Sequence, residues 1–428
     1  VPSSAHSIIG GIDGALSLGS FGGYIIFKFE DPVENAPDNP FGIDFTIFGN
    51  PLSNWSEHGI VSVMNDMNEN GLPDDTWYEL AGSEYFFTST IMNYSVSYTN
   101  PGENTAKNIP WADNQGNSGF IITNDYHTHS YYPNSDSFPD IDPVEYTLSG
   151  TRVTNPVDRS DPSYVNSYRK AFGYADNQPK GVPPYTIPDN PYTLEIENSG
   201  GDPFDISWAV NDSGKYVELD EIHFIKVHNS VLANGGWMGE ISTEIRGAID
   251  VPPNKHISGP EEMIILRDLP DTISGNSYQL EAFLFSEGRW NVNHNIVWNV
   301  SLAGVEIDNK NILHFNSSGE LVITVSKAGD PEIHSSGSTY LQYERSTWSR
   351  YTMRKKIRLY PNPAHNIFKI EGINECKVSV FDLTGVCLIS EKQYEKLAPI
   401  HIHHLSDGIY LVKITSDELK KTIRLIKK

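Results

Sequence analysis

Short runs of apolar residues, alternating with polar ones or standing together, recur along the whole chain. In its first 250 residues they occupy 23–29, 43–49, 60–63, 94–98, 204–210 and 222–227. Within 43–49 the apolar side chains recur every second residue, which places Ile43, Phe45 and Ile47 on one face of a strand. Short strands separated by turn-forming clusters predict an all-β module, a large jelly-roll-like β-sandwich, rather than βαβ units. The stretches 100–142 and 154–192 are predicted to be long loops.

A second series of strand-like runs follows a turn-rich segment at 252–260 and occupies 279–285, 295–300, 304–308 and 320–325. This rhythm resembles the bacterial Ig-like repeats of surface proteins and places Trp298 between two sheets. We expect this module to space or support the first. A second break near 346–356 gives predicted domains at 1–253, 258–346 and 355–428.

The composition of the 428-residue chain supports this picture: it contains 34 Gly and 27 Pro, a load typical of turn-rich β-proteins. No apolar stretch is long enough to cross a membrane as a helix. The chain opens at Val1 rather than Met, so we expect that a leader has been removed.

Charge is distributed unevenly along the chain. The chain carries a net charge of −24; the part from Arg354 onward has 14 basic and 8 acidic residues, so residues 1–353 carry −30. Such an acidic body disfavours nucleic acid and anionic membrane as partners and is compatible with divalent cations and neutral ligands. It is equally the solvated surface of a secreted protein.

The basic C-terminal segment has a motif order of its own: Leu-Tyr-Pro-Asn-Pro-Ala at 359–364, a Val-Phe-Asp-Leu-Thr-Gly turn at 380–385, Asp-Gly-Ile-Tyr at 407–410, and a cationic last strand. This order resembles the type A sorting domain of the type IX secretion system of Bacteroidetes. The resemblance implies a small β-sandwich, recognition of 355–428 by the outer-membrane secretion machinery, and an exported or surface location. The two cysteines, Cys376 and Cys387, flank the first turn and are interpreted either as a disulfide or as two free thiols.

The segment 66–75 has the clearest chemistry. Asp66, Asn68 and Asn70 stand at alternate positions, and Gly71 follows for a sharp turn, as in loops that bind calcium through oxygen ligands. The Leu72 carbonyl and the carboxylates Asp74 and Asp75, or Glu79, would complete the shell. Trp77 replaces the Glu expected at the twelfth position, so this is not a complete EF-hand loop. A metal-free Asx-rich turn is the alternative.

Several aromatic residues fall in or beside predicted loops, where flat rings suit a sugar or a large planar cofactor. The candidate ligand-binding residues are Trp55, Trp111, Tyr131, Tyr132 and Trp237. Core packing is the alternative for each of them, and Trp208 is assigned to the core.

Two weaker groups of residues are candidates for catalysis or metal binding. Glu240 and Glu244 form a carboxylate pair of the kind used in glycoside hydrolysis, although their separation in sequence does not fix their distance. His127 and His129 would share one face of a strand, but no third zinc ligand accompanies them. We therefore expect a protein that is not an enzyme.

Residues 15–250 also contain a set of short sequence motifs: Asp-Phe-Thr-Ile-Phe-Gly-Asn at 44–50, Trp-Ser-Glu-His-Gly-Ile-Val at 55–61, Phe-Gly-Tyr-Ala-Asp-Asn at 172–177 and Gly-Glu-Ile-Ser-Thr-Glu-Ile at 239–245. This set is similar to a family of Bacteroidetes cell-surface proteins that accompany corrinoid (vitamin B12) uptake machinery. The resemblance implies capture of a corrinoid or related nutrient for a TonB-dependent transporter. A calcium-dependent glycan-binding protein is the alternative, and a glycoside hydrolase is third.

Overall fold

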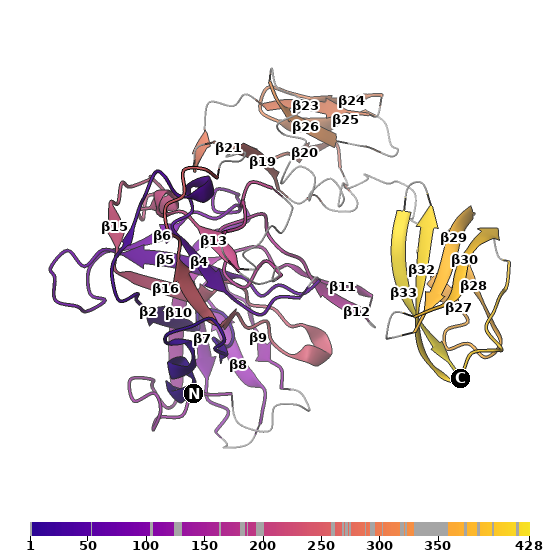
Figure 1. The fold of residues 1–428 in the computed structure, drawn as a ribbon, viewed down its shortest axis with the longest axis horizontal. Helices are drawn as coiled ribbons and strands as arrows, with labels where there is room; N and C mark the ends of the chain where they lie inside the picture. Colours follow the sequence, from indigo (N-terminus) through magenta and orange to yellow (C-terminus); the bar gives the residue numbers. More distant parts are fainter. Residues whose placement is uncertain are drawn as a thin grey trace.

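The computed structural model is built almost entirely from short β-strands, which confirms the all-β prediction (Figure 1). It describes residues 2–52, 54–102, 106–123, 131–161, 164–179, 185, 187–193, 201–257, 262–267, 269, 273, 275–286, 288–291, 296–301, 303–316, 321, 323–328, 358–371, 375–382, 386–395, 398–416 and 419–428. Helical segments in this part of the chain are single turns: α1 (Pro2–Ala5), η1 (His6–Ile8), η2 (Pro40–Gly42), η3 (Ile206–Trp208) and η4 (Gly236–Met238). None is long and apolar enough to cross a membrane.

The first module contains β1 (Leu16–Ser17), β2 (Tyr24–Phe27), β3 (Val33–Glu34), β4 (Phe45–Phe48), β5 (Gly59–Met64), β6 (Trp77–Leu80), β7 (Ile91–Thr99), β8 (Ile109–Asp113), β9 (Ser118–Ile121), β10 (Glu145–Arg152), β11 (Val157–Asp161), β12 (Tyr164–Ser167), β13 (Asp202–Phe204), β14 (Ala209–Val210), β15 (Glu221–Ile222), β16 (Phe224–Asn229), β17 (Glu244–Ile245) and β18 (Gly247–Asp250). A five-stranded antiparallel sheet, β14-β6-β5-β16-β2, packs against a three-stranded one, β13-β4-β18. Ile43, Phe45 and Ile47 share the core between these sheets, as the alternation predicts, but β4 is buried on both faces because Thr46 and Phe48 are buried too. The finer prediction of a jelly roll is not established by this strand order.

A third sheet, β10-β7-β8-β9, covers the opposite face of the five-stranded sheet near β16. Its Gly150 lies against the ring of His228, where an added Cβ would come within 2.6 Å of the imidazole. Thr151 contacts two side chains of the five-stranded sheet. Its hydroxyl donates to Glu79 at 2.6 Å, and its carbonyl lies 3.3 Å from His228 Nε2. These contacts place one buried and one partly buried titratable side chain, His228 and Glu79, between sheets.

The structure corrects two sequence predictions in this module. The run 204–210 is not one strand, because η3 interrupts it: Asp205 caps this turn by accepting the Ser207 N–H at 2.7 Å. The stretches 100–142 and 154–192 are not loops throughout, since they contain β8, β9, β11 and β12. The assignment of Trp208 to the core is confirmed, because none of its side chain is exposed.

The second module contains β19 (Glu262–Leu266), β20 (Ser277–Gln279), β21 (Ala282–Ser286), β22 (Arg289–Asn291), β23 (Ile296–Val300), β24 (Val305–Ile307), β25 (Ile312–Phe315) and β26 (Ile323–Lys327). Its sheet β19-β21-β22 is buried on both faces. One face places Met263, Ile265 and Phe285 in the same core as β4 and β5 of the first module. The other face packs within the second module, through Ile264 and Leu284 among others. The predicted run 279–285 is therefore two strands that belong to different sheets.

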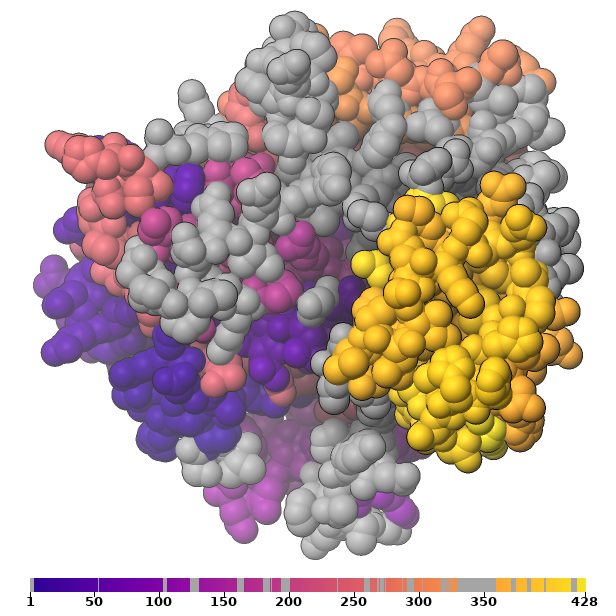
Figure 2. Space-filling model, turned by 45° about the vertical axis from the view of Figure 1, so that its right-hand side comes forward, coloured from indigo at the N-terminus to yellow at the C-terminus, as the bar shows by residue number. Residues whose placement is uncertain are grey.

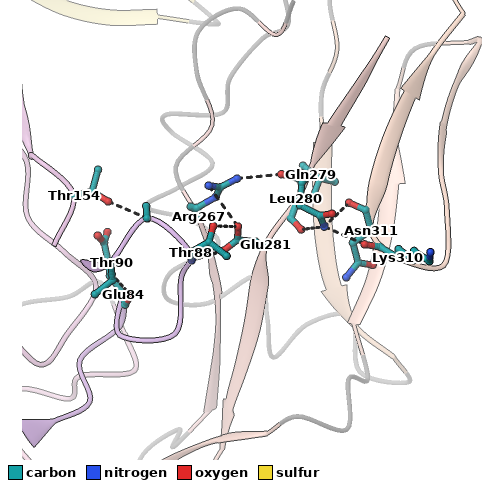
Figure 3. A network of polar contacts seen from close by, with 11 residues as sticks. Glu84, Thr88, Thr90, Thr154, Arg267, Gln279, Leu280, Glu281, Lys310 and Asn311 are labelled. Carbon is teal, nitrogen blue, oxygen red and sulfur yellow. Dashed lines mark hydrogen bonds and ion pairs between the residues drawn. The ribbon is translucent and has the colours of Figure 1, made fainter. Parts of the chain in front are cut away.

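Aromatic and polar contacts extend this shared core to the rim of the interface. The ring centroids of Phe86 and Trp290 lie 4.4 Å apart, and those of Phe87 and Phe283 lie 5.0 Å apart. At the edge, Glu281 accepts two hydrogen bonds from Thr88, one from its hydroxyl at 2.5 Å and one from its N–H at 2.9 Å (Figure 3). The second module is thus packed into the first rather than held apart from it.

The C-terminal module contains β27 (Arg358–Tyr360), β28 (Ile367–Glu371), β29 (Glu375–Phe381), β30 (Cys387–Glu395), β31 (Ile400–His401), β32 (Gly408–Ser416) and β33 (Leu419–Lys427). Two sheets, β27-β28-β31 and β30-β29-β32-β33, enclose a core whose described members all belong to this segment. In the space-filling view these residues form one contiguous yellow lobe (Figure 2). Both cysteines are free: Cys376 is buried opposite Tyr394, whereas Cys387 is exposed opposite Phe381.

Candidate functional site

Several connecting segments of the first module meet beside the ends of β4, β5 and β16. Trp55 bridges to Ser167 at the end of β12, and Gly59 bridges to Ala175. Farther along this edge, β17 pairs with β1. The chain folds this way because the strands that carry these segments are neighbours in the five- and three-stranded sheets. Strings 55–61, 172–177 and 239–245, remote in sequence, consequently lie at one edge of the module, which we call the loop edge.

Carboxyl groups concentrate at the loop edge. Asp176 is buried and accepts two backbone N–H groups, from Asn50 at 2.6 Å and from Glu244 at 2.8 Å. Glu57 accepts the Ser242 N–H at 3.0 Å. Burial raises the pKa of Glu57 to about 8, with a further contribution from the nearby Glu244. Burial, together with the neighbouring Glu57, also holds the pKa of Asp176 well above its usual range. At neutral pH Glu57 therefore retains its proton and can donate a hydrogen bond as well as accept one.

The predicted carboxylate pair differs in how its members are held. Glu244 is fixed by hydrogen bonds from the Ser17 hydroxyl at 3.1 Å and the Asn50 amide at 2.8 Å. In contrast, Oε2 of Glu240 is buried and has no hydrogen-bond partner among the described residues. Burial raises the pKa of Tyr131, and the charge of Glu240 adds to this effect, which places the two groups near each other. The pair is thus one carboxylate fixed by two side chains and one whose Oε2 is buried without a hydrogen-bond partner among the described residues.

The five aromatic candidates fall into three situations. Trp55 and Tyr132 are each only 7% exposed, which favours the core-packing alternative for both. Trp55 packs in a small core and against Gly235, where an added Cβ would lie 2.6 Å from its ring. Trp111 and Tyr131 are partly buried against the cluster that holds Tyr132. The side chain of Trp237 lies outside the described part of the chain, and its backbone forms η4.

The structure nevertheless brings most of these candidates toward one place. Trp111, Tyr131 and Tyr132 share a cluster with Leu232, while Trp55 shares another with Val231. The segment 231–233 therefore links the two aromatic clusters, and Glu240 follows it closely in the chain. Ligand binding by these residues stays a prediction.

The loop 66–75 forms a compact Asx-rich turn between β5 and β6. The buried carboxylate of Asp66 accepts the N–H groups of Asn70 at 3.1 Å and Gly71 at 2.7 Å. The amides of Asn68 and Asn70 donate to Asp74, and the Asn68 N–H donates to Asp75 at 3.3 Å. Within the described residues, no three His, Cys, Asp or Glu side chains are grouped so that they could hold a metal ion.

A calcium ion in this loop would therefore need oxygens from the Asn side chains and the Leu72 carbonyl beside the carboxylates. The amide orientation that presents Nδ2 to Asp74 is the one suited to the metal-free turn, and a rotated amide would present oxygen instead. Glu79 does not complete this shell, because it lies between sheets with its pKa raised to about 7 by burial. The calcium prediction is not tested by these contacts.

Sequence reasoning singled out the strings of the loop edge but missed their most perturbed groups, Glu57 and Asp176. The available signal was a carboxyl residue inside an otherwise apolar or Gly-rich string, a position where burial is expected. His127 and His129 lie outside the described residues.

Comparison with known proteins bears on the C-terminal module. No curated protein matches the chain. Residues 358–428 match the secretion system C-terminal sorting domain. This match agrees with the resemblance to the type IX sorting domain, and it accounts for the separate core and basic last strand of this module. The chain is therefore an exported protein, addressed by its last 71 residues to the secretion machinery and destined for the outer-membrane surface or the medium.

Proposed function

We propose that this exported protein binds a nutrient at the cell surface, with a corrinoid as the favoured ligand, and passes it to a TonB-dependent outer-membrane transporter. The observation that supports this most directly is the convergence at the loop edge of the strings that resemble corrinoid-associated surface proteins. Trp55 and Glu57 come from the string 55–61 and Glu240 from the string 239–245, and all three lie at the same edge.

The chemistry of the loop edge suits such a ligand. A corrinoid is a large flat macrocycle with amide side chains around its rim. A carboxylate such as Glu240 accepts hydrogen bonds from amide N–H groups, and a protonated Glu57 can donate to amide oxygens. Tyr131 supplies aromatic surface beside them. The mechanism is equilibrium binding without chemical change of the ligand.

Calorimetric titration of the full chain with cyanocobalamin tests the proposal. We expect a dissociation constant below about 100 μM, equivalent to about −5.5 kcal/mol. Glu240→Gln should weaken binding about tenfold, the cost of one charge-assisted hydrogen bond. Glu306→Gln, an exposed carboxylate on β24, is the matched control and should bind as the wild type does. Absence of binding at this concentration would remove the corrinoid from consideration.

We further propose that calcium orders the loop 66–75 through Asp66, Asp74 and neighbouring amide and carbonyl oxygens. Calcium-dependent glycan binding is the second candidate function. It is favoured by Phe120 on β9, a ring that is 56% exposed. A glycan array read with and without calcium separates it from corrinoid capture. Sugar release by the wild type that disappears in Glu240→Ala would instead favour a glycoside hydrolase.

A further inference from the structure

The last strand of the sorting domain, β33, forms the edge of its four-stranded sheet and pairs on one side with β32. Near its end, the other side of β33 is occupied by the segment 361–365, which contains the Pro-Asn-Pro-Ala motif. Ala364 bridges to Lys427 in a parallel manner: its N–H donates to the Ile426 carbonyl at 2.8 Å, and its carbonyl accepts the Lys428 N–H at 2.9 Å.

The side chain of Asn362 extends this short ladder by one rung. Its Nδ2 donates to the Arg424 carbonyl at 2.7 Å, and its Oδ1 accepts the Ile426 N–H at 2.9 Å. A residue in a parallel strand makes the same pair of bonds, to the carbonyl before and the N–H after its partner. The side-chain amide therefore replaces a peptide group at a position flanked by Pro361 and Pro363, neither of which has an N–H to donate.

Together with the pairing to β32, these two rungs hold the register that decides which side chains at the end of β33 face outward. In the observed register Leu425 is fully buried and Lys427 is 9% exposed, with its ammonium 3.1 Å from Asp407. Arg424 and Lys428 are exposed. A slip of one residue would exchange the two sets, because side chains alternate between the faces of a strand.

We propose that Asn362 is a positioning residue for export: it holds β33 in the register that presents Arg424 and Lys428 outward, and recognition by the secretion machinery depends on that register. Alanine at this position removes one donor and one acceptor, so the Arg424 carbonyl and the Ile426 N–H lose these bonds while the two Ala364 bonds remain. Asp at this position keeps an acceptor for the Ile426 N–H but has no donor for the Arg424 carbonyl.

The test uses the full chain produced in a bacterium that has a type IX secretion system. Two quantities are measured: the fraction of protein that reaches the surface or medium, and the amide exchange rate of Ile426. In Asn362→Ala we expect exchange to accelerate about tenfold, the loss of one hydrogen bond, and the exported fraction to fall severalfold. Asn362→Asp should lower export while slowing exchange relative to alanine.

Two matched variants distinguish positioning from general stability. Asn366→Ala removes an exposed asparagine next to this segment, whose backbone carbonyl accepts the Ile402 N–H. It should leave export and exchange unchanged. Val378→Ala weakens the core of the domain at β29, away from the strand end, and should be exported while it remains folded. Normal export of Asn362→Ala, unchanged exchange at Ile426, or equal export loss in Val378→Ala at matched thermal stability would each overturn the proposal.

Discussion

Replacing Phe285 by alanine should destabilise the first module, although Phe285 lies in a strand of the second. The side chain is fully buried and meets the ring of Phe172 edge to face, with centroids 5.0 Å apart. It shares one core with β4 and β13. Truncating a buried Phe costs about 3–5 kcal/mol through lost burial and the remaining cavity.

Native-state hydrogen exchange measures this cost strand by strand. In Phe285→Ala, the free energy of opening of the slowest amides in β4 and β13 should fall by about 3–5 kcal/mol. Leu313→Ala is the matched control: Leu313 is fully buried, but its cluster contains only residues of the second module. It should lower protection in β20 and β25 and leave β4 unchanged. Unaltered protection of β4 in Phe285→Ala would refute the shared core.

Four further predictions concern single features. Burial lowers the pKa of His228 from 6.5 to about 4, so the neutral imidazole contributes fully to stability above pH 6.5, and this contribution falls by about 3 kcal/mol as the pH drops to 4. The difference in unfolding free energy between the wild type and His228→Asn, measured in urea, should follow this curve. The same difference for His256→Gln, at an exposed site, should not follow it. Calcium at millimolar concentration should raise the unfolding temperature of the wild type and of Asp136→Asn but not of Asp66→Asn; no shift in the wild type would exclude the calcium site. Gly235→Ala should destabilise the protein by about 1–3 kcal/mol, because its methyl group would overlap Trp55, whereas Gly11→Ala, in open space, should change its thermal unfolding little. Deletion of 358–428 should retain the protein in the periplasm, and secretion at wild-type amounts would contradict its role as the export signal.

Local sequence patterns predicted the features that depend on residues close in sequence, such as strand positions and the faces of their side chains. The alternation in β4 places Ile43, Phe45 and Ile47 in one core, and β29 and β30 pair on either side of the predicted turn, whose residues 383–385 lie outside the described part of the chain. The partner of an apolar face is not written in the local pattern. The run from Met263 to Leu266 is apolar throughout because two cores share it, and sequence alone does not tell such a strand from one buried within a single module.

The candidate site was harder to predict for the same reason. Trp55 lies in a polar, loop-like string, yet Gly235 from a segment 180 residues later removes the space around it. The raised pKa of Glu57 depends on burial and on Glu244 nearby, so it arises only when remote strings meet. Sequence patterns identified these strings as important, while the tertiary fold decides which of their side chains are structural.

The bridge between Ala364 and Lys427 brings the entrance and the exit of the C-terminal module together. Its core draws on no described residue outside 358–428. A unit with adjoining ends and a self-sufficient interior can be appended to unrelated cargo without rebuilding either partner. The same transfer should fail for residues 262–327. Removing them would expose the core of the first module, and in a new protein the apolar side chains that face this core would be exposed to solvent.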